Sequence, residues 1–274
     1  MIFDFKLRPI REIQPWGRAP NLTLPWFGLS DGFYRLDVDG DYLLNYAPAT
    51  VAAHAREYPA VYPGPYAEYQ VVRLWEDVYG MLYDVLQPLP KELQDFLEKD
   101  YAEQQLWRDK AYAWLKNLPI DHPDRERSDT LYEAATFWHN DRRLDTAYLN
   151  PGARIWMWST KKFVTIAWDN RAIARDGIPV WSAGRGVYRL PRDDFFDEVR
   201  SFDRRFIAAV KERVDEVCAT WDRHEIVINM EVLRREQAER ANWFRTAMHR
   251  SAPVFSWDEV SQAMASIGRM IAGQ

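Results

Sequence analysis

The amino-acid sequence predicts an α+β fold, in which an antiparallel sheet, formed by an N-terminal hairpin and a central three- to four-stranded meander, packs against several long amphipathic helices. Two observations carry this prediction. Strand-like runs follow one another through very short turns, which only antiparallel neighbours permit. Strands and helices also come in blocks along the chain, whereas a βαβ-wound sheet requires them to alternate.

The length and composition fit one folded unit. The chain has 274 residues, of which 47% are hydrophobic and 28% are charged, and a chain of this kind can bury a substantial core. We expect a single α+β domain over residues 1–274. Its sheet is expected from residues 1–65 and 141–190, and its helices from residues 66–140 and 191–274.

The N-terminal region predicts a short strand and a hairpin. Residues 2–25 are interrupted by four prolines, so we expect one short strand followed by an extended segment at the surface. From Phe33 to Tyr46, two strand-like runs, FYRLDV and DYLLNY, flank Asp39-Gly40. An Asp-Gly pair tolerates the positive φ angles of a type I′ turn, so this stretch predicts a β-hairpin.

Three helices are expected between the hairpin and the meander. Apolar residues recur at helical spacing over about residues 69–86, where two prolines end the pattern. A second helix is expected over about residues 91–117. A third is expected over about residues 128–140, with Ser128 or Asp129 as its N-cap.

The central region contains the clearest strand signals. Three runs follow each other closely: RLDTAYL (143–149), ARIWMWST (153–160) and KFVTIAWDN (162–170). Alternation in the third run predicts a strand with one face on the core. A fourth run, GIPVWSAGRGVYRLP (177–191), is expected to extend the sheet.

The C-terminal third is expected to be helical. A long amphipathic helix follows Pro191, with Asp193 or Asp194 as its N-terminal cap or dipole partner. Another helix is expected over about residues 228–249. The last begins with a capping box at Ser256–Glu259, where a serine is followed three residues later by a glutamate.

The charge balance narrows the classes of partner. The chain has 36 basic and 41 acidic residues, a formal net charge of −5. A dedicated nucleic-acid binder presents a basic surface, so we expect no nucleic acid as partner. A moderately acidic protein remains suited to a basic protein partner.

Cysteine and histidine usage argues against metal and disulfide chemistry. The one cysteine, Cys218, excludes an internal disulfide and a multi-cysteine zinc site, and we expect it to be a small core residue. None of the five histidines is paired at i, i+4. No phosphate-binding glycine motif is present, so we expect no cofactor.

The sequence also bears on the compartment. The N-terminal stretch lacks the apolar core of a signal peptide, and no run approaches the length of a membrane span. We therefore expect a cytoplasmic protein that does not associate with membranes.

One short motif resembles a catalytic signature. Residues 28–32, GLSDG, fit the Gly-x-Ser-x-Gly pattern of a serine hydrolase elbow, with Ser30 as the nucleophile. Such an elbow needs a strand before the serine and a helix directly after it. The residues after Ser30 alternate like a strand, so a turn into the hairpin is the favoured interpretation.

The densest polar segment outside the predicted turns gives the candidate site. FWHNDRRLD places His139, Asp141 and Arg142 between a helix end and a strand start, a position where functional sites are common. Asp169 and Arg171 follow the end of a strand and are expected nearby. The alternatives are a solvated helix C-terminus for the first group, where His and Arg are favourable, and an Asx turn for the second.

Several long stretches together resemble a family of uncharacterised bacterial proteins of about this length. The resemblance rests on FDFKLRPIREIQPWG, LPWFGLSDGFYRLDVDGDYLLNY, RLDTAYLNPGARIWMWSTKKFVTIAWDN and VWSAGRGVYRLPRDDFFDEVRSFDRRFIAAVKERV. It spans nearly the whole chain, so it implies that the chain is one family unit. It implies no activity and no catalytic residues.

Two classes of function fit these observations best, and a purely structural or regulatory dimer is a third possibility. Aromatic residues make up 15% of the chain; most are expected in the core, but Trp and Tyr are also enriched at protein interfaces. The leading hypothesis is a protein-binding module, such as an immunity or antitoxin-like protein with a basic partner. The alternative is an enzyme or small-ligand-binding protein with an aromatic-lined pocket at the sheet edge, formed by the five candidate residues.

Overall fold

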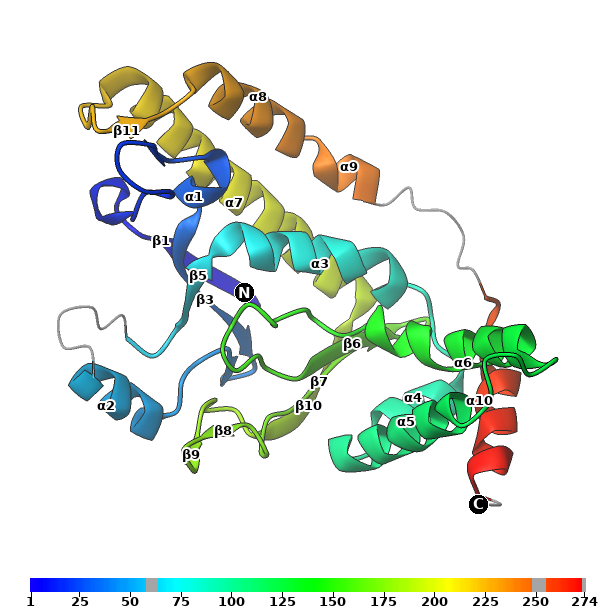
Figure 1. The fold of residues 1–274 in the computed structure, drawn as a ribbon. Coiled ribbons are helices and arrows are strands. Elements are labelled where there is room, and N and C mark those ends of the chain that lie inside the picture. The colour runs from blue at the N-terminus through cyan, green and yellow to red at the C-terminus, as the bar shows by residue number, and fades with distance from the viewer. Residues whose placement is uncertain (58–63, 248–254, 273–274) are drawn as a thin grey trace.

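The computed structural model describes residues 1–57, 64–247 and 255–272, and it confirms the α+β fold (Figure 1). The strands are β1 (Phe3–Leu7), β2 (Leu22–Thr23), β3 (Asp31–Val38), β4 (Asp41–Leu43), β5 (Ala67–Gln70), β6 (Ile155–Ser159), β7 (Phe163–Asp169), β8 (Ala174–Arg175), β9 (Ile178–Pro179), β10 (Arg185–Pro191) and β11 (Ile226–Val227). The helices are α1 (Trp26–Leu29), α2 (Pro48–Glu57), α3 (Val71–Val85), α4 (Lys91–Leu97), α5 (Tyr101–Lys116), α6 (Arg125–Asn140), α7 (Arg192–Thr220), α8 (Met230–Arg240), α9 (Trp243–Ala247) and α10 (Trp257–Ala272), with a single 3-10 turn at Ile10–Glu12.

The N-terminal sheet is built around β3. This strand pairs antiparallel with β1 along one edge and with β4 and β5 along the other. Between β3 and β4, Asp39 and Gly40 have φ angles of 53° and 90°. These are the positive values that a type I′ turn requires, so the hairpin prediction is confirmed. The pairing with β5 was not expected.

The central sheet is an antiparallel meander in the order β10–β7–β6. Two of its strands lie in the second and third expected runs, and β10 lies in the fourth. The first expected strand, residues 143–149, is wrong. That segment forms turns and touches the sheet through a single bridge between Arg143 and Trp156.

Both faces of the central sheet are covered at β6 and β7, although the alternation in β7 predicted only one buried face. On one face, β7 presents Val164, Ile166 and Trp168 to the core beneath α3 and α7. On the other, Trp156 and Trp158 of β6 join a second cluster with α4 and α6. The opposite side of β7 is therefore buried by helices that come from distant parts of the chain.

Two expected helices are each divided in the structure. The region 91–117 holds α4 and α5, and the region 228–249 holds α8 and α9, with residues 248–249 outside the described residues. At the first break, the Gln104 amide donates hydrogen bonds to the carbonyl oxygens of Leu97 and Lys99, at 3.1 and 3.0 Å. Carbonyls at a helix end lack partners within the helix, so this side chain stabilises the interruption.

Helix starts depend on tertiary contacts as well as on capping residues. Helix α6 begins at Arg125, earlier than expected, because the Arg125 side chain donates to the carbonyl oxygens of Leu115 and Leu118 at the end of α5. The expected N-caps within α6 are therefore wrong. Helix α7 begins at Arg192 without a side-chain cap, and the two aspartates lie in its first turn, where they complement the helix dipole.

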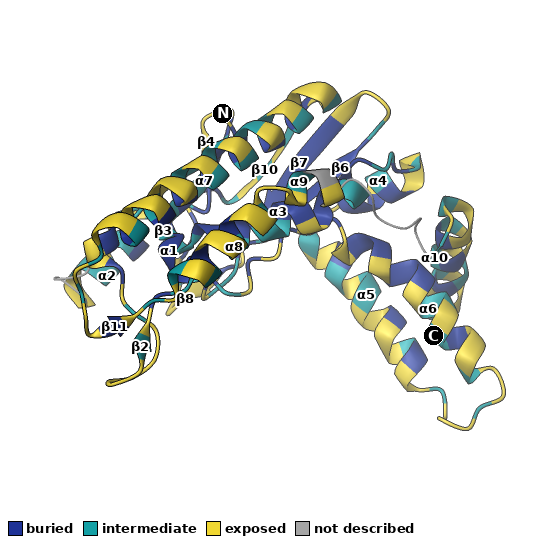
Figure 2. Ribbon diagram, turned by 90° about the horizontal axis from the view of Figure 1, so that it is seen from above, coloured by how far each residue is buried: buried dark blue, intermediate teal, exposed yellow. Residues whose placement is uncertain are grey.

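The capping box of the last helix is confirmed. The backbone amide of Ser256 donates to Glu259 Oε2 at 2.7 Å, and the amide of Glu259 donates to Ser256 Oγ at 3.3 Å. Helix α10 packs against α5 and α6 at one end of the molecule, far from β2 and β11 (Figures 1 and 2). Small residues at the centre of this helical group let the helices approach closely: Ala111, Ala134, Ala135 and Ala263.

Much of the aromatic excess is core. Helix α7 presents Phe202 and Phe206 to the rings of Phe3 and Phe5, with Phe3 stacked on Phe202 at a centroid distance of 5.1 Å. Burial of such rings supplies much of the hydrophobic stabilisation of a fold of this size. Among the described residues, no helix is both long and apolar enough to cross a membrane.

Candidate functional site

The five predicted site residues lie in two places. His139, Asp141 and Arg142 lie at the end of α6, whereas Asp169 and Arg171 lie at the end of β7. The two groups are connected through the ring of Trp156, which lies 5.9 Å from the His139 ring and 5.6 Å from that of Tyr101. Tyr101 in turn donates its backbone amide to Asp169 at 3.5 Å.

His139 is a buried and fully hydrogen-bonded side chain. Only 2% of it is exposed, and its Nδ1 lies 3.3 Å from an Arg108 nitrogen, which can only donate. The proton of the neutral ring is therefore assigned to Nε2, which lies 3.0 Å from Gln104 Oε1. Burial, together with the positive charges of Arg108 and Arg143, lowers the pKa of His139 to about 3. The ring is neutral at physiological pH and supports the local packing.

Arg142 is also buried, with 1% of its surface exposed. Its guanidinium donates to the carbonyl oxygens of Trp138 and Asp84, both at 2.8 Å, and lies 4.9 Å from the ring centre of Trp257. Burial lowers its pKa to about 10. Asp141, by contrast, is exposed at the C-cap of α6. The arginine thus joins α3, α6 and α10.

Asp169, which is largely buried, forms an ion pair with the half-exposed Arg171. Arg171 donates to Asp169 Oδ2 at 2.7 Å and to Asp100 at 3.1 Å. The hydrogen bonds from Arg171 hold the pKa of Asp169 below its usual value. The amide of Arg171 also lies 3.4 Å from Asp169 Oδ1, which is the contact of an Asx turn. A shared ligand site for all five residues stays a prediction.

Ser30 lies in a structural turn. It ends the short helix α1, and β3 follows at once. Its hydroxyl is buried, donates to the carbonyl oxygen of Phe27 at 2.7 Å and accepts the amide of Val72 at 3.3 Å. A side-chain carbon at Gly32 would lie 2.4 Å from the carbonyl oxygen of Lys6 in β1. The glycine therefore permits strand pairing, and the order of elements is unlike that of a hydrolase elbow.

Sequence reasoning missed a buried polar cluster formed by Tyr34, Asp77 and Tyr148. Tyr34 Oη, Asp77 Oδ2 and Tyr148 Oη are buried, and the hydroxyl of Tyr148 interacts with both of the other groups. Burial raises the pKa of Asp77 to about 7, although the nearby Arg73 opposes this shift. The three residues come from separate segments, so no local spacing could have indicated them.

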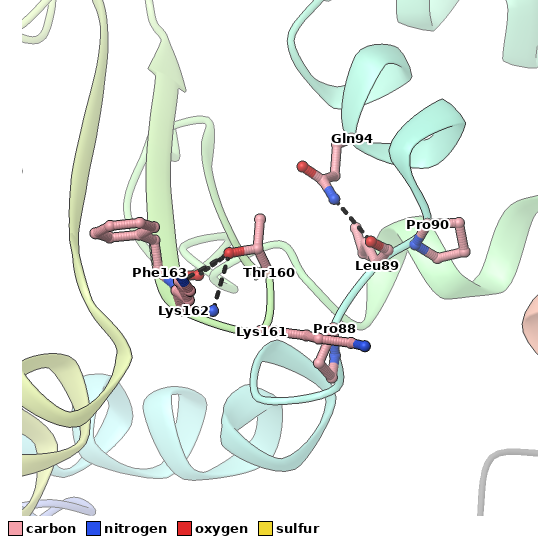
Figure 3. Close-up of a pocket in the computed structure, with 8 residues that line it drawn as sticks. All are labelled: Pro88, Leu89, Pro90, Gln94, Thr160, Lys161, Lys162 and Phe163. Atoms are coloured by element: carbon pink, nitrogen blue, oxygen red, sulfur yellow. Dashed lines mark hydrogen bonds between the residues drawn. The ribbon is translucent and has the colours of Figure 1, made fainter.

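A cavity of about 550 Å³ lies beside the turn between β6 and β7 (Figure 3). Figure 3 shows that its polar groups bind one another: Thr160 Oγ1 accepts the amides of Lys162 and Phe163, and Gln94 donates to the carbonyl oxygen of Leu89. The rest of the lining combines Pro88 and Pro90 with the side chains of two lysines, Lys161 and Lys162. This cavity offers no set of convergent catalytic groups.

A second surface feature lies along β10, the edge strand of the central sheet. The amide of Asn170 donates to the carbonyl oxygen of Gly184 before the strand, and the amide of Arg192 donates to that of Lys162 after it. Both bonds continue the β10–β7 register on either side of the strand, and Gly184 and Arg192 are eight residues apart. Because antiparallel pairs alternate, Gly186, Tyr188 and Leu190 bond to β7.

The remaining residues of β10 present their backbone groups to the open edge. By the same alternation, the amide and carbonyl groups of Arg185, Val187 and Arg189 point away from β7, and no described residue forms a backbone hydrogen bond with them. Val187 is 52% exposed. Arg185 and Arg189 pair with Asp100 and Glu98 in the α4–α5 connection, so their side chains turn toward one face of the sheet.

An acidic cavity of about 590 Å³ adjoins this edge. Tyr188, Arg189 and Leu190 of β10 form part of its wall. The other walls come from the β3–β4 turn, the start of the chain and the first turns of α7. Five of its lining residues are acidic: Asp37, Asp39, Asp194, Asp197 and Glu198. Within the described residues, no group of histidine, cysteine and carboxylate side chains is arranged to hold a metal ion.

The comparisons with known proteins identify the family. The model of a family of unknown function, DUF5984, matches residues 2–263. The chain belongs to this family, which confirms the resemblance seen in the sequence. A search of curated proteins and a search of solved structures each found no match.

Proposed function

We propose that this chain is a protein-binding module that binds an extended segment of its partner as an additional strand on β10. The observation that carries the proposal is the row of unpaired backbone groups at Arg185, Val187 and Arg189. An exposed strand edge is a ready template for another chain, because each added residue pair supplies main-chain hydrogen bonds. The strand has 7 residues, enough for several such bonds.

The features that usually protect an edge strand are weak here. Natural proteins block edges with inward-pointing charges, bulges or a covering loop. On β10 both arginines are bound to carboxylates of the α4–α5 connection, and the residue between them, Val187, is aliphatic and half-exposed. The central part of the edge is therefore accessible and apolar.

The form of this function that we propose is an immunity or antitoxin-like protein, which neutralises its partner by binding it. Strand addition gives affinity through the backbone and specificity through the alternating side chains, which suits recognition of one partner. The acidic character of the chain, with a net charge of −5, favours fast association with a basic partner.

The test is a pull-down at low salt from the native host, with the products of neighbouring genes as the first candidates. Wild-type protein is compared with Val187→Pro, which removes an outward-facing amide, and with Val187→Thr, which keeps that amide and the strand propensity. We expect the wild type and Val187→Thr to retain the same partner and Val187→Pro to lose it. Equal retention by all three proteins would contradict strand addition.

A neutralising role has its own readout. Co-expression with the captured partner should restore growth if that partner is toxic, and Val187→Pro should fail to do so. If the captured partner is not toxic, the proposal of a binding module stands, but the proposal of an immunity or antitoxin-like protein is wrong.

A further inference from the structure

We infer that the partner segment bound at β10 is basic, and that it places a lysine or arginine side chain in the acidic cavity beside Tyr188–Pro191. This inference rests on the proposed function, because it assigns the chemistry of the segment that pairs with the same edge. The inference also specifies that the positive charge of the partner segment lies beside the second half of β10.

The cavity carries more negative charge than its own residues neutralise. Glu198 accepts the backbone amide of Ile2 at 2.7 Å, and Asp37 accepts the amide of Gly40 at 3.3 Å. Asp39, Asp194 and Asp197 are exposed and form no ion pair or hydrogen bond with the described residues. Three carboxylates are thus available to a ligand in addition to the two that have backbone partners.

The two cations on the cavity wall do not cancel this charge. Arg189 is directed to Glu98, at 2.5 Å, on the α4–α5 connection. The amino group of Met1 lies 3.8 Å from Glu198 and can offset one carboxylate. A positively charged side chain entering the cavity would face several unpaired carboxylates at once, and such charge complementarity raises both association rate and specificity.

The cavity and the strand edge are continuous. Tyr188, Arg189 and Leu190 belong both to the second half of β10 and to the cavity wall. A segment hydrogen-bonded to Val187 and Arg189 must pass the mouth of the cavity, since successive residues of a strand advance by about 3.3 Å. A long flexible lysine or arginine side chain then reaches the carboxylates without distortion of the pairing.

The cavity on the other side of Pro191 is basic. A positively charged side chain of the partner is therefore expected on the acidic side only. A neighbouring cavity of about 520 Å³ shares Pro191 with the acidic one but is lined by Lys161, Lys162 and Arg192. Asp193, in the first turn of α7, lies in that basic cavity, whereas Asp194 lies in the acidic one. These two adjacent aspartates therefore provide a matched pair for the test.

The test uses synthetic peptides with blocked ends and the same length as β10. One alternates valine with lysine, the second alternates valine with glutamate, and the third is the lysine peptide with a central proline that prevents strand pairing. Binding to the full chain is measured by NMR shift changes, at low and at physiological salt. The proteins compared are the wild type, Asp194→Asn/Asp197→Asn, Asp193→Asn and Val187→Pro.

We expect the lysine peptide to bind the wild type and Asp193→Asn equally, with shifts centred on β10. Binding should weaken about tenfold in Asp194→Asn/Asp197→Asn and in physiological salt, and should be lost in Val187→Pro and with the proline-containing peptide. The glutamate peptide should not bind.

Other outcomes separate the two proposals. If the lysine and glutamate peptides bind equally well and Val187→Pro weakens both, the strand edge stands and the basic partner is wrong. If the lysine peptide binds Val187→Pro as well as the wild type, the attraction is purely electrostatic and strand addition is wrong. If the lysine peptide does not bind the wild type, the inference is overturned.

Discussion

The central sheet has two edges, and the part of the chain that the structure describes closes only one of them. On β6, bonds across to β7 involve even-numbered residues, so Ile155, Met157 and Ser159 face outward. All three are engaged: the carbonyl oxygen of Ile155 accepts the amide of Leu144, the amide of Met157 donates to Arg142, and the carbonyl oxygen of Ser159 accepts the amide of Leu89, at 2.8–2.9 Å. The outward groups of β10 have no such partners among residues 1–57, 64–247 and 255–272.

The difference lies in what covers each edge. The β6 edge is closed by two irregular segments, residues 142–144 and the Pro88–Pro90 connection, and both faces of that strand are buried. The β10 edge is covered on one face by α7 and meets an acidic cavity instead of a chain segment. An unpaired strand edge beside a predominantly acidic cavity supports the proposed binding of a partner segment.

The largest expected effect breaks the closed edge. Arg142→Met removes the two side-chain hydrogen bonds that tie residues 142–144, the segment that closes the β6 edge, to α6 and α3, and it leaves the carbonyl oxygens of Trp138 and Asp84 without this donor. We expect a loss of about 3 kcal/mol in the free energy of unfolding, measured by urea denaturation. Arg143→Met is the control: its side chain is exposed, so the change should stay within about 0.5 kcal/mol. Equal losses would show that Arg142 does not anchor this edge.

The second prediction concerns the pairing of β10 with β7. A side-chain carbon at Gly186 would lie 2.1 Å from the ring of Trp168, the residue directly opposite. Gly186→Ala must displace this buried ring, at an expected cost of about 2 kcal/mol in thermal or urea unfolding. At Gly184 the nearest atom would lie 3.5 Å away, so Gly184→Ala should be nearly neutral. A neutral Gly186→Ala would contradict the register of the open edge.

The third prediction is a pH dependence near the closed edge. Because the pKa of folded His139, about 3, lies below its unfolded value of about 6.5, the unfolded state takes up a proton first on acidification. This group therefore reduces stability by about 1.4 kcal/mol per pH unit as the pH falls below about 6.5. The glutamine of His139→Gln does not titrate. The difference in unfolding free energy between the wild type and this variant should therefore shrink as the pH falls from 6 to 4.

Asp77 must be separated from this effect. Its folded pKa of about 7 lies above the unfolded value of about 3.9, so its contribution changes stability in the opposite direction: the fold gains stability as the pH falls from about 7 to 4. Asp77 is present in both proteins and cancels in the difference between wild type and His139→Gln. An unchanged difference across this pH range, measured by urea unfolding, would mean that His139 titrates normally in the fold.

The two edges also show what the sequence could and could not reveal. The β3–β4 hairpin and the start of α10 were predictable because their signals are local: Asp39-Gly40 adopts the turn itself, and Ser256 and Glu259 cap the helix from within it. The closure of β6 depends on Arg142, whose partners lie in α3 and α6. No local pattern encodes such a contact. Residues 143–149 likewise have a strand-like sequence but do not pair as a strand.

The candidate site illustrates the same limit. His139 and Arg142 stood out as a polar cluster next to a strand, but polar side chains at a helix end can be buried and satisfied by carbonyls and amides from elsewhere, as both are here. The openness of β10 was equally hidden. The composition of β10 indicates a strand. Whether another segment pairs with its outer edge depends on where the rest of the chain folds, which the sequence of β10 itself does not encode.

The smallest expected effect concerns the open edge itself. Val187→Pro removes an amide that points away from β7 and has no described partner, and proline is tolerated on the free side of an edge strand. Val187→Ala is the control, because it shortens the same half-exposed side chain but keeps the amide. We expect the two variants to differ by less than about 1 kcal/mol in urea unfolding. A difference of several kcal/mol would mean that the Val187 amide is bonded within the fold, and β10 would then be no more available to a partner than β6.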